Sequence, residues 1–238
     1  MRRRVLNKKE EQSFRYTIEQ INYSTTWTVP ANCLKIDAFL VGGGGGGGAH
    51  SNTSGQVGLG GNGGACVLVE EIPVVSGESI SVSIGNAGSR GVGVGNSGTN
   101  GGTTSITYKS HVYSAAGGKG GRSGNYFPDP QPGHSLGGGS WNVDGTDGED
   151  GKPNPLDLLD ENLYGAGGGG GSNNYTGYYG ASSGGKTGGG GSNGCEGQPA
   201  TFFGAGGGGG SFNANHSYGS GGNGYKGIVI LRCAYKEA

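Results

Sequence analysis

One segment of the sequence has the letters of a phosphate-binding loop. Residues 180–187 read Gly-Ala-Ser-Ser-Gly-Gly-Lys-Thr, which matches G-x-x-x-x-G-K-[ST] at every required position. Such a loop binds phosphates when a buried strand precedes it and a helix follows it. Here residues 173–179 are polar and aromatic, and residues 188–191 are all glycine, which does not sustain a helix. A nucleotide-dependent enzyme using Lys186 is therefore the least favoured hypothesis, and it predicts that Lys186→Ala abolishes ATP binding.

Other groups of reactive residues also lack the spacing that chemistry requires. Residues 93–98 fit G-x-G-x-x-G, but no helical sequence follows them. A compact acidic loop does not have the spacing of an EF-hand, so a solvated loop is favoured over a calcium site. Histidines and cysteines are dispersed, with no C-x-x-C pair and no zinc spacing. We expect no enzyme, no bound metal and no cofactor; the acidic residues are Asp144, Asp147, Glu149 and Asp150.

Glycine dominates the composition, with 61 of 238 residues, and only 31% of residues are hydrophobic. This composition alone is typical of low complexity or disorder, and any folded interpretation has to explain it. The net charge of -1 supplies no self-repulsion to hold the chain open. It also argues against a general nucleic-acid-binding protein, which usually shows an excess of basic residues.

Basic residues are concentrated at the N-terminus, within an arm of residues 1–12. We interpret this arm as a solvated or docking segment in preference to a nucleic-acid patch. No apolar stretch follows the arginines, so no secretory signal is expected, and no apolar run approaches the ~20 residues that span a bilayer. The candidate docking residues are Arg2, Arg3, Arg4, Lys8 and Lys9.

Strand patterns frame the glycine tracts within a single domain of residues 13–238. They occur near residues 14–41, 65–84, 103–116 and 226–235. The runs at 65–72 and 79–84 are predicted to form one hairpin, and those at 103–108 and 111–114 another. Helix patterns are nearly absent, although residues 155–164 could form one short helical turn.

A glycine-containing unit occurs twice. Residues 164–172 are an aromatic residue, Gly, Ala, five glycines and Ser, and residues 203–211 repeat this order. Repeated sequence indicates repeated structure. Because ordering glycine is entropically costly, only close backbone packing and hydrogen bonding could offset that cost. Extended helices with three residues per turn, packed side by side, would satisfy this condition. We therefore favour polyglycine helices clamped by β-strands over disorder.

Several segments resemble a glycine-rich domain family found in bacteriophage tail and fibre proteins. They are Thr-Trp-Thr-Val-Pro-Ala at 26–31, the apolar run at 34–42 that enters a glycine tract, the segment at 72–85 and the closing strand at 224–232. In the third segment Ser76 stands where proline is usual. The resemblance implies an all-β fold, a β-sandwich or jelly-roll-like shell with inserted polyglycine-type helices and little or no α-helix. It also implies a virion protein, made in the host cytoplasm, with a role at a fibre or tail tip.

Loops rich in aromatic and amide side chains separate the glycine tracts. Such residues on a rigid support resemble the chemistry of antibody paratopes, although they could instead pack over the glycine lattice. The leading hypothesis is an adhesin that binds a host surface protein or glycan. The alternative is a structural virion component, such as a head fibre, decoration or tail-assembly protein. Other virion proteins would contact the arm, and a homo-oligomer is possible, with no trimer demanded. The candidate ligand-binding residues are Tyr126, Phe127, Trp141, Tyr175, Tyr178, Tyr179, Phe212, His216 and Tyr218.

Overall fold

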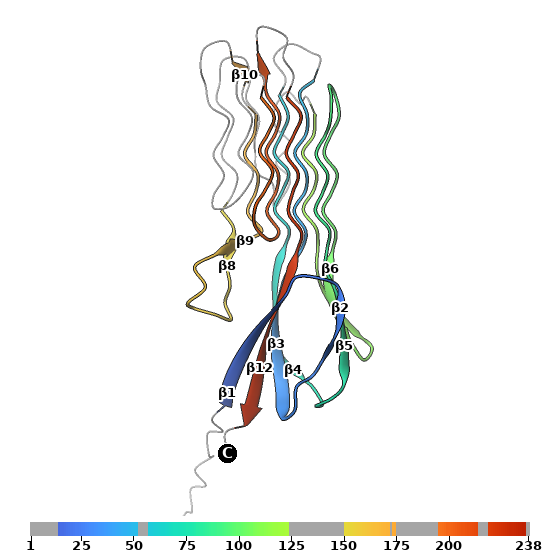
Figure 1. Cartoon of the computed structure of the whole chain (residues 1–238), viewed down its shortest axis with the longest axis vertical. Helices are drawn as coiled ribbons and strands as arrows, with labels where there is room; N and C mark the ends of the chain where they lie inside the picture. Colours follow the sequence, from blue (N-terminus) through green and yellow to red (C-terminus); the bar gives the residue numbers. More distant parts are fainter. Residues whose placement is uncertain are drawn as a thin grey trace, which may run out of the picture.

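The computed structural model describes residues 14–51, 57–123, 150–171, 173–174, 195–213 and 219–236. The fold is all-β, because no described residue lies in a helix. Two regions follow one another along the long axis: β-sheets at one end and a bundle of extended segments at the other (Figure 1). Within the described part there is no helix long and apolar enough to cross a membrane.

Two four-stranded antiparallel sheets form the first region. We call one the terminal sheet because it pairs the strands nearest both chain ends. Its order is β1 (Phe14–Ile21), β12 (Ile228–Lys236), β3 (Cys33–Val41) and β4 (Cys66–Pro73). The second sheet has the order β2 (Thr25–Thr28), β5 (Ser79–Ser83), β6 (Thr104–Tyr108) and β7 (His111–Ala115). The remaining strands are two-residue pairs: β8 (Lys152–Pro153) with β9 (Leu163–Tyr164), and β10 (Asn173–Asn174) with β11 (Phe212–Asn213).

Both sheets contribute side chains to one apolar cluster. In β5 the sequence Ser-Ile-Ser-Val-Ser alternates between exposed and buried positions, as expected of a strand with one face in the core. Ile80 of β5, Ile36 of β3 and Leu231 of β12 all pack in this cluster. The central strands β3 and β12 are also buried on their other face, where Phe39 and Ile230 belong to a second cluster. Their nearly continuous apolar sequences reflect burial on both faces.

Of the two hairpins predicted from the sequence, one is present in the structure and the other is not. The hairpin predicted at 103–108 and 111–114 is confirmed, since β6 pairs with β7 across Lys109, which has a φ of 53°. The hairpin predicted between 65–72 and 79–84 is wrong. β4 pairs with β3 and β5 pairs with β2 and β6, so the intervening turn carries the chain from one sheet to the other. Each strand thereby faces the shared core from its own sheet.

The second region is the glycine lattice. It comprises extended segments that lie side by side (Figure 1) and are joined by backbone hydrogen bonds. Its segments are residues 42–50, 57–65, 85–91, 96–102, 116–122, 166–171, 195–200, 204–210 and 219–225.

Residues 42–50 form the centre of this lattice. Their successive N–H groups donate in rotation to three antiparallel neighbours, 57–65, 96–102 and 219–225, at N···O distances of 2.8–3.1 Å. Every third residue bonds to the same neighbour; for example, the N–H groups of Gly42, Gly45 and Gly48 donate to Ala65, Asn62 and Leu59. This three-residue period is that of an extended helix with three residues per turn.

The carbonyl groups of the central segment accept hydrogen bonds from three further neighbours, which run parallel to it. Gly43 and Gly46 accept from residues 116–122, and the next carbonyls along the chain accept in turn from residues 85–91 and 204–210. Six segments therefore surround the central one. The predicted polyglycine packing is present, and backbone hydrogen bonding takes the place of a side-chain core.

Close approach explains why these positions are glycine. A Cβ atom built on Gly44 would lie 1.9 Å from the carbonyl oxygen of Ala205, and one on Gly45 would lie 2.1 Å from that of Lys119. Every residue from 42 to 48 would meet a backbone oxygen at 2.3 Å or less. Backbone atoms do not move aside as a flexible side chain would. No residue with a Cβ fits here.

The repeated unit corresponds to a repeated structure. Gly165 and Gly204, which occupy equivalent positions, have φ angles of 69° and 73°, a conformation that favours glycine. After this shared turn the two copies run side by side, because Gly206 donates to Ala166 and Gly209 donates to Gly169. The repeat therefore supplies two adjacent segments of the lattice.

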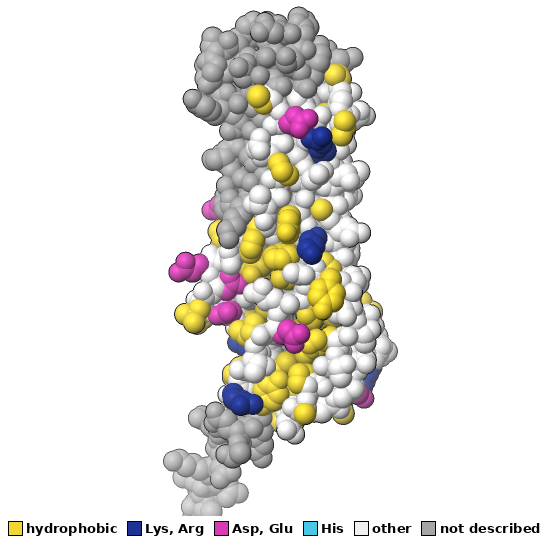
Figure 2. Space-filling view, in the orientation of Figure 1, with side chains coloured by type: hydrophobic (Ala, Val, Ile, Leu, Met, Phe, Trp, Pro, Cys, Tyr) yellow, Lys and Arg dark blue, Asp and Glu magenta, His cyan; other side chains and the backbone are white. Residues whose placement is uncertain are grey.

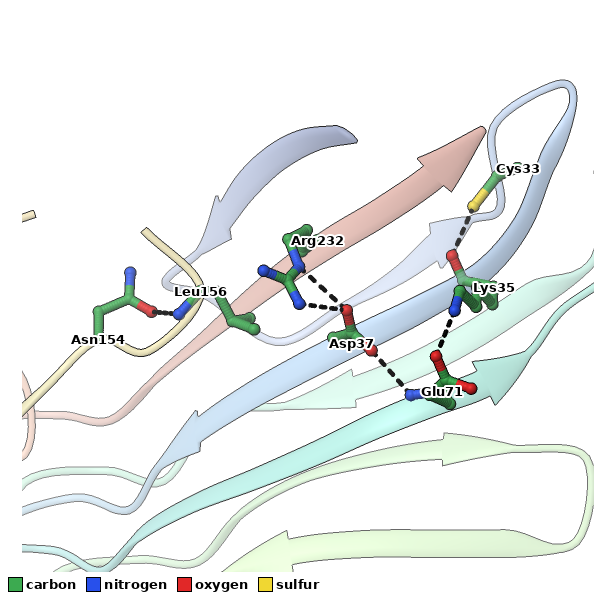
Figure 3. A network of polar contacts seen from close by, with 7 residues as sticks. All are labelled: Cys33, Lys35, Asp37, Glu71, Asn154, Leu156 and Arg232. Carbon is green, nitrogen blue, oxygen red and sulfur yellow. Dashed lines mark hydrogen bonds and ion pairs between the residues drawn. The ribbon is translucent and has the colours of Figure 1, made fainter. Parts of the chain in front are cut away.

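A buried ion pair joins three strands of the terminal sheet (Figure 3). Asp37 of β3 is only 5% exposed, and its Oδ2 atom accepts from Arg232 Nε at 3.0 Å and Nη2 at 2.8 Å. Its Oδ1 atom accepts the backbone N–H of Glu71 at 2.7 Å, and Glu71 has a φ of 59°. The register between β3 and β4 shifts at this point. The carboxylate of Asp37 thus forms an ion pair with Arg232 of β12 and accepts the N–H of Glu71 at the irregular position in β4.

Candidate binding site at the end of the glycine lattice

The lattice ends, away from the sheets, in a set of connections that we call the distal end. It comprises residues 49–51, 91–96, 123, 173–174, 195, 211–213 and 219. Hydrogen bonds join several of these residues: His50 N–H donates to Gly219 at 3.1 Å, and Gly219 N–H donates to Ser211 at 2.8 Å. β10 and β11 pair here as well.

A tight turn at residues 91–96 presents two apolar side chains. Gly93 and Gly95 have φ angles of 74° and 83°. Val92, which precedes Gly93, is 59% exposed, and Val94, which lies between the two glycines, is 39% exposed. The side-chain amide of Asn96 donates to the carbonyl of Val92 at 2.6 Å and closes the turn.

Two backbone bonds fix this turn to the central segment. Gly95 N–H donates to His50 at 2.7 Å, and Ala49 N–H donates to Asn96 at 2.9 Å. Val92 and Val94 are therefore exposed on a backbone that is already ordered, so a partner would bind them at a small entropic cost.

Two stacked rings lie within the distal end, and one of them belongs to the last residue of the central segment. His50 is 1% exposed and stacks on Phe212 of β11, with ring centroids 4.6 Å apart and an angle of 17° between the planes. Removal of the imidazole from water lowers the pKa of His50 to about 4, because burial penalises the charged form. The ring is thus neutral near pH 7.

An ion pair lies along the side of the lattice near this end. Arg90 Nη1 contacts Glu196 Oε2 at 2.6 Å, and the Arg90 backbone N–H donates to Asn223 Oδ1 at 2.9 Å. Both charged side chains are partly exposed, so the pair contributes little to stability. Together with the bond from the Arg90 backbone to Asn223, the pair does join three lattice segments that are distant in sequence.

The match to known families covers nearly the whole chain. Residues 19–234 match a family described as a glycine-rich domain. The chain belongs to the glycine-rich domain family. No curated protein matches it.

Most of the binding residues predicted for this glycine-rich domain lie outside the described residues. These are Tyr126, Phe127, Trp141, Tyr175, Tyr178, Tyr179, His216 and Tyr218, and the same is true of the docking residues Arg2, Arg3, Arg4, Lys8 and Lys9. The described chain does reach the distal end at Ser51, Ser123, Asn174 and Asn213, immediately before segments that are not described. Phe212 is the one candidate in the described part. Its side chain is 9% exposed and stacks on His50, and its binding role stays a prediction.

Val92 and Val94 were not among the residues predicted from sequence. Residues 93–98 match a nucleotide-binding pattern, whereas the structure places them in a turn between two lattice segments. The signal in the sequence is the alternation Gly-Val-Gly-Val-Gly at 91–95. Gly93 and Gly95, which have positive φ angles, end the regular segment there, and the valines of this turn are exposed.

A second exposed apolar feature lies nearer the sheets, in the excursion between β8 and β9 (Figure 1). Leu158 and Leu159 are 95% and 91% exposed. The Oδ1 atom of Asp157 accepts a hydrogen bond from the backbone N–H of Leu159 at 3.0 Å. The backbone carbonyl of Asp157 accepts one from the N–H of Asp160 at 3.1 Å. This segment therefore forms hydrogen-bonded turns in place of the helical turn that the sequence could have formed.

Hydrogen bonds from neighbouring residues hold this excursion in place. The Tyr164 hydroxyl donates to Asp160 Oδ2 at 2.7 Å, and Asn154 donates to the same atom at 3.1 Å. Tyr164 also belongs to the apolar cluster on the outer face of the terminal sheet. On the face shown in Figure 2, hydrophobic side chains gather over this part of the molecule and are sparse over the lattice.

Proposed function

We propose that this chain is a phage fibre or tail-tip protein that binds a host receptor through the distal end of its glycine lattice. The observation that carries the proposal is the turn at residues 91–96, where backbone hydrogen bonds to Ala49 and His50 hold Val92 and Val94 exposed. The predicted aromatic residues follow, in sequence, from lattice segments that end at the same place.

A backbone lattice suits this role for a physical reason. Its segments are joined mainly by hydrogen bonds between their own amide groups, and a few side chains such as Asn96 close the turns. Tyrosine, asparagine and serine at such turns supply large contact area and adaptable hydrogen bonds. Because their support is ordered before binding, most of the contact energy contributes to affinity.

The proposal is tested by binding of the purified protein to panels of candidate host cells. We compare the wild type with Val92→Ser/Val94→Ser and with Tyr175→Ala/Tyr178→Ala/Tyr179→Ala. The matched control is Val112→Ser, because Val112 is also an exposed valine but lies in β7 of the second sheet. We expect strain-specific binding by the wild type and the control, and at least tenfold weaker binding by the valine variant, the tyrosine variant or both.

Failure of the folded wild type to bind any plausible host would contradict the receptor-binding proposal. Equal binding by all variants would place the contact away from the distal end. Circular dichroism and melting curves, compared with those of the wild type, show whether each variant is folded.

One observation favours the alternative, a structural virion component. Two adjacent leucines, exposed on a hydrogen-bonded turn, are typical of a surface that is covered in an assembly. If neighbouring virion subunits cover them, Leu158→Asp/Leu159→Asp will prevent incorporation of the chain into particles while the isolated protein stays folded. Immunoblotting of purified particles measures this, with Val112→Ser again as the control.

A further inference from the structure

Two buried thiols lie on neighbouring strands of the terminal sheet. Cys33 begins β3 and Cys233 lies in β12; both are reduced and at most 2% exposed. Their side chains belong to the same core cluster, on the face that the terminal sheet turns toward the second sheet.

The local register brings these two residues near one another. Cys233 is opposite Ile36, whereas Cys33 is opposite Tyr235, because the pairing shifts between Ala234 and Tyr235. The shift leaves Cys33 and Cys233 on the same face and diagonal to each other, because Tyr235, which is opposite Cys33, lies two residues beyond Cys233. Both side chains pack in the same core cluster, where the Cys33 thiol donates to the carbonyl oxygen of Lys35 at 3.4 Å and each thiol affects the pKa of the other. A disulfide requires two cysteines whose side chains approach each other from adjacent backbones. Cys33 and Cys233 share one face of two neighbouring strands, so a small movement of the ends of β3 and β12 toward each other would join them.

Cys66 lies apart from this pair. It packs against the cluster on the opposite face of the terminal sheet, and its Sγ atom is 3.5 Å from the carbonyl oxygen of Tyr164. Cys195 is exposed at the distal end of the lattice. Any selective cross-link in this chain would therefore join Cys33 to Cys233.

We propose that Cys33 and Cys233 form an intramolecular disulfide by exchange with a low-molecular-weight disulfide such as oxidised glutathione. One cysteine loses its proton and attacks glutathione disulfide, which gives a mixed disulfide and releases one glutathione thiolate. The second cysteine then loses its proton and displaces the remaining glutathione. The cysteines lose two electrons, which reduce one glutathione disulfide to two molecules of glutathione.

Burial controls when this exchange occurs. The thiolate is the reactive form, and burial, followed by the neighbouring Cys233, raises the pKa of Cys33 to about 12. The folded protein therefore exchanges slowly. Exchange becomes fast when the ends of β3 and β12 separate, either during folding or at urea concentrations just below the unfolding midpoint.

The cross-link would enclose nearly the whole chain, from residue 33 to residue 233, including every segment of the glycine lattice. Closing a loop of this length restricts the unfolded chain strongly. We expect the oxidised protein to melt about 10 °C higher than the reduced protein.

The experiment incubates the protein with oxidised glutathione at increasing urea, blocks remaining thiols with an alkylating reagent, and maps the peptides by mass spectrometry. It uses the wild type and the Cys66→Ser/Cys195→Ser variant, which keeps only the proposed pair. Cys33→Ala is the matched control, because it keeps the buried Cys233 without its partner. We expect a linked Cys33–Cys233 peptide in the first two proteins, at a rate that rises at least tenfold with urea, and none in the control.

The proposal is overturned if oxidation links a different pair, or if both cysteines carry glutathione without joining. It is also overturned if neither cysteine is oxidised after complete unfolding and refolding in oxidised glutathione. The melting temperature supplies an independent readout. A linked protein that melts no higher than the reduced form contradicts the stabilising role.

Discussion

In residues 42–48 of the glycine lattice, each Cα atom faces a backbone carbonyl group of a neighbouring segment. Gly45→Ala would place a methyl group 2.1 Å from the oxygen of Lys119. We expect it to lower the free energy of unfolding by about 3 kcal/mol or more, because backbone on both sides has to move. Urea unfolding of the purified variant measures the loss.

Gly77→Ala is the control for this substitution. Gly77 has a φ of 82°, but no atom lies within 4 Å of the position that an added methyl group would take. Only the conformational penalty of about 1–2 kcal/mol therefore applies. If Gly45→Ala were no more destabilising than Gly77→Ala, close packing would not be the reason for glycine in the lattice.

His50 makes stability depend on pH. The unfolded chain protonates this residue near its ordinary pKa of 6.5, whereas the folded protein protonates it only near pH 4. Between these values the unfolded state binds more protons, so stability falls as the pH decreases. The full contribution is about 3 kcal/mol, present above pH 6.5 and lost by pH 4.

The pH dependence is measured by urea unfolding at pH 7 and pH 4 for the wild type and His50→Phe. The substitution keeps an aromatic ring on Phe212 and removes the titration. We expect His50→Phe to lose about 3 kcal/mol less stability than the wild type between the two pH values. An equal loss in both proteins would assign the effect to carboxylates elsewhere.

At the scale of elements, the strands and the lattice could be predicted from sequence, but the pairing could be predicted only in part. β5 alternates apolar and polar residues, and β6 and β7 are joined by a two-residue turn, so local sequence is sufficient for both. The hairpin expected between β4 and β5 does not form. Which of two sheets a strand joins depends on contacts distant in sequence, and the turn before Glu78 does not reveal it.

The candidate site, too, could be predicted from the sequence only in part. Aromatic and amide residues stand out in a glycine-rich sequence, and their segments adjoin the distal end. Val92 and Val94 did not stand out, because their exposure follows from the conformation of Gly93 and Gly95. The burial of Phe212 was also hidden, since it depends on His50, which is distant in sequence.

Asp37 connects the strands of the terminal sheet, and its removal would leave Arg232 without its carboxylate. Asp37 is 5% exposed and also accepts the N–H of Glu71. We expect Asp37→Ala to lower the free energy of unfolding by about 3–5 kcal/mol, because a partly buried charge and a backbone donor lose their partner. Chemical denaturation measures this.

Glu71→Gln tests an exposed ion pair in the same sheet. Glu71 contacts Lys35, and the Glu71 side chain is 72% exposed, so the expected cost is below about 1 kcal/mol. If the two substitutions had equal effects, burial of Asp37 would not explain its contribution.

At the scale of the whole molecule, the lattice and the sheets are continuous. β3 leads directly into the central segment at Gly42, and Gly227 leads from the lattice into β12. Because residues 42–50 bond to six other segments, they cannot separate alone. We expect their amides to exchange hydrogen with the same opening free energy as those of β12.

Native-state hydrogen exchange at increasing urea compares the two groups of amides. Converging exchange curves would show that the lattice and the terminal sheet unfold as one unit. Exchange of residues 42–50 at a much lower free energy would show that the lattice opens while the sheets remain folded.

The direction of the lattice hydrogen bonds has a mechanical consequence. The segments run along the long axis (Figure 1), and the bonds that join them cross between neighbours. A pull applied between the distal end and the sheets therefore loads many of these bonds at once, in shear, so that no single bond can break ahead of the others. Tension would be spread over the full cross-section, and a rod in which glycine is the commonest residue would be stiff along its own length.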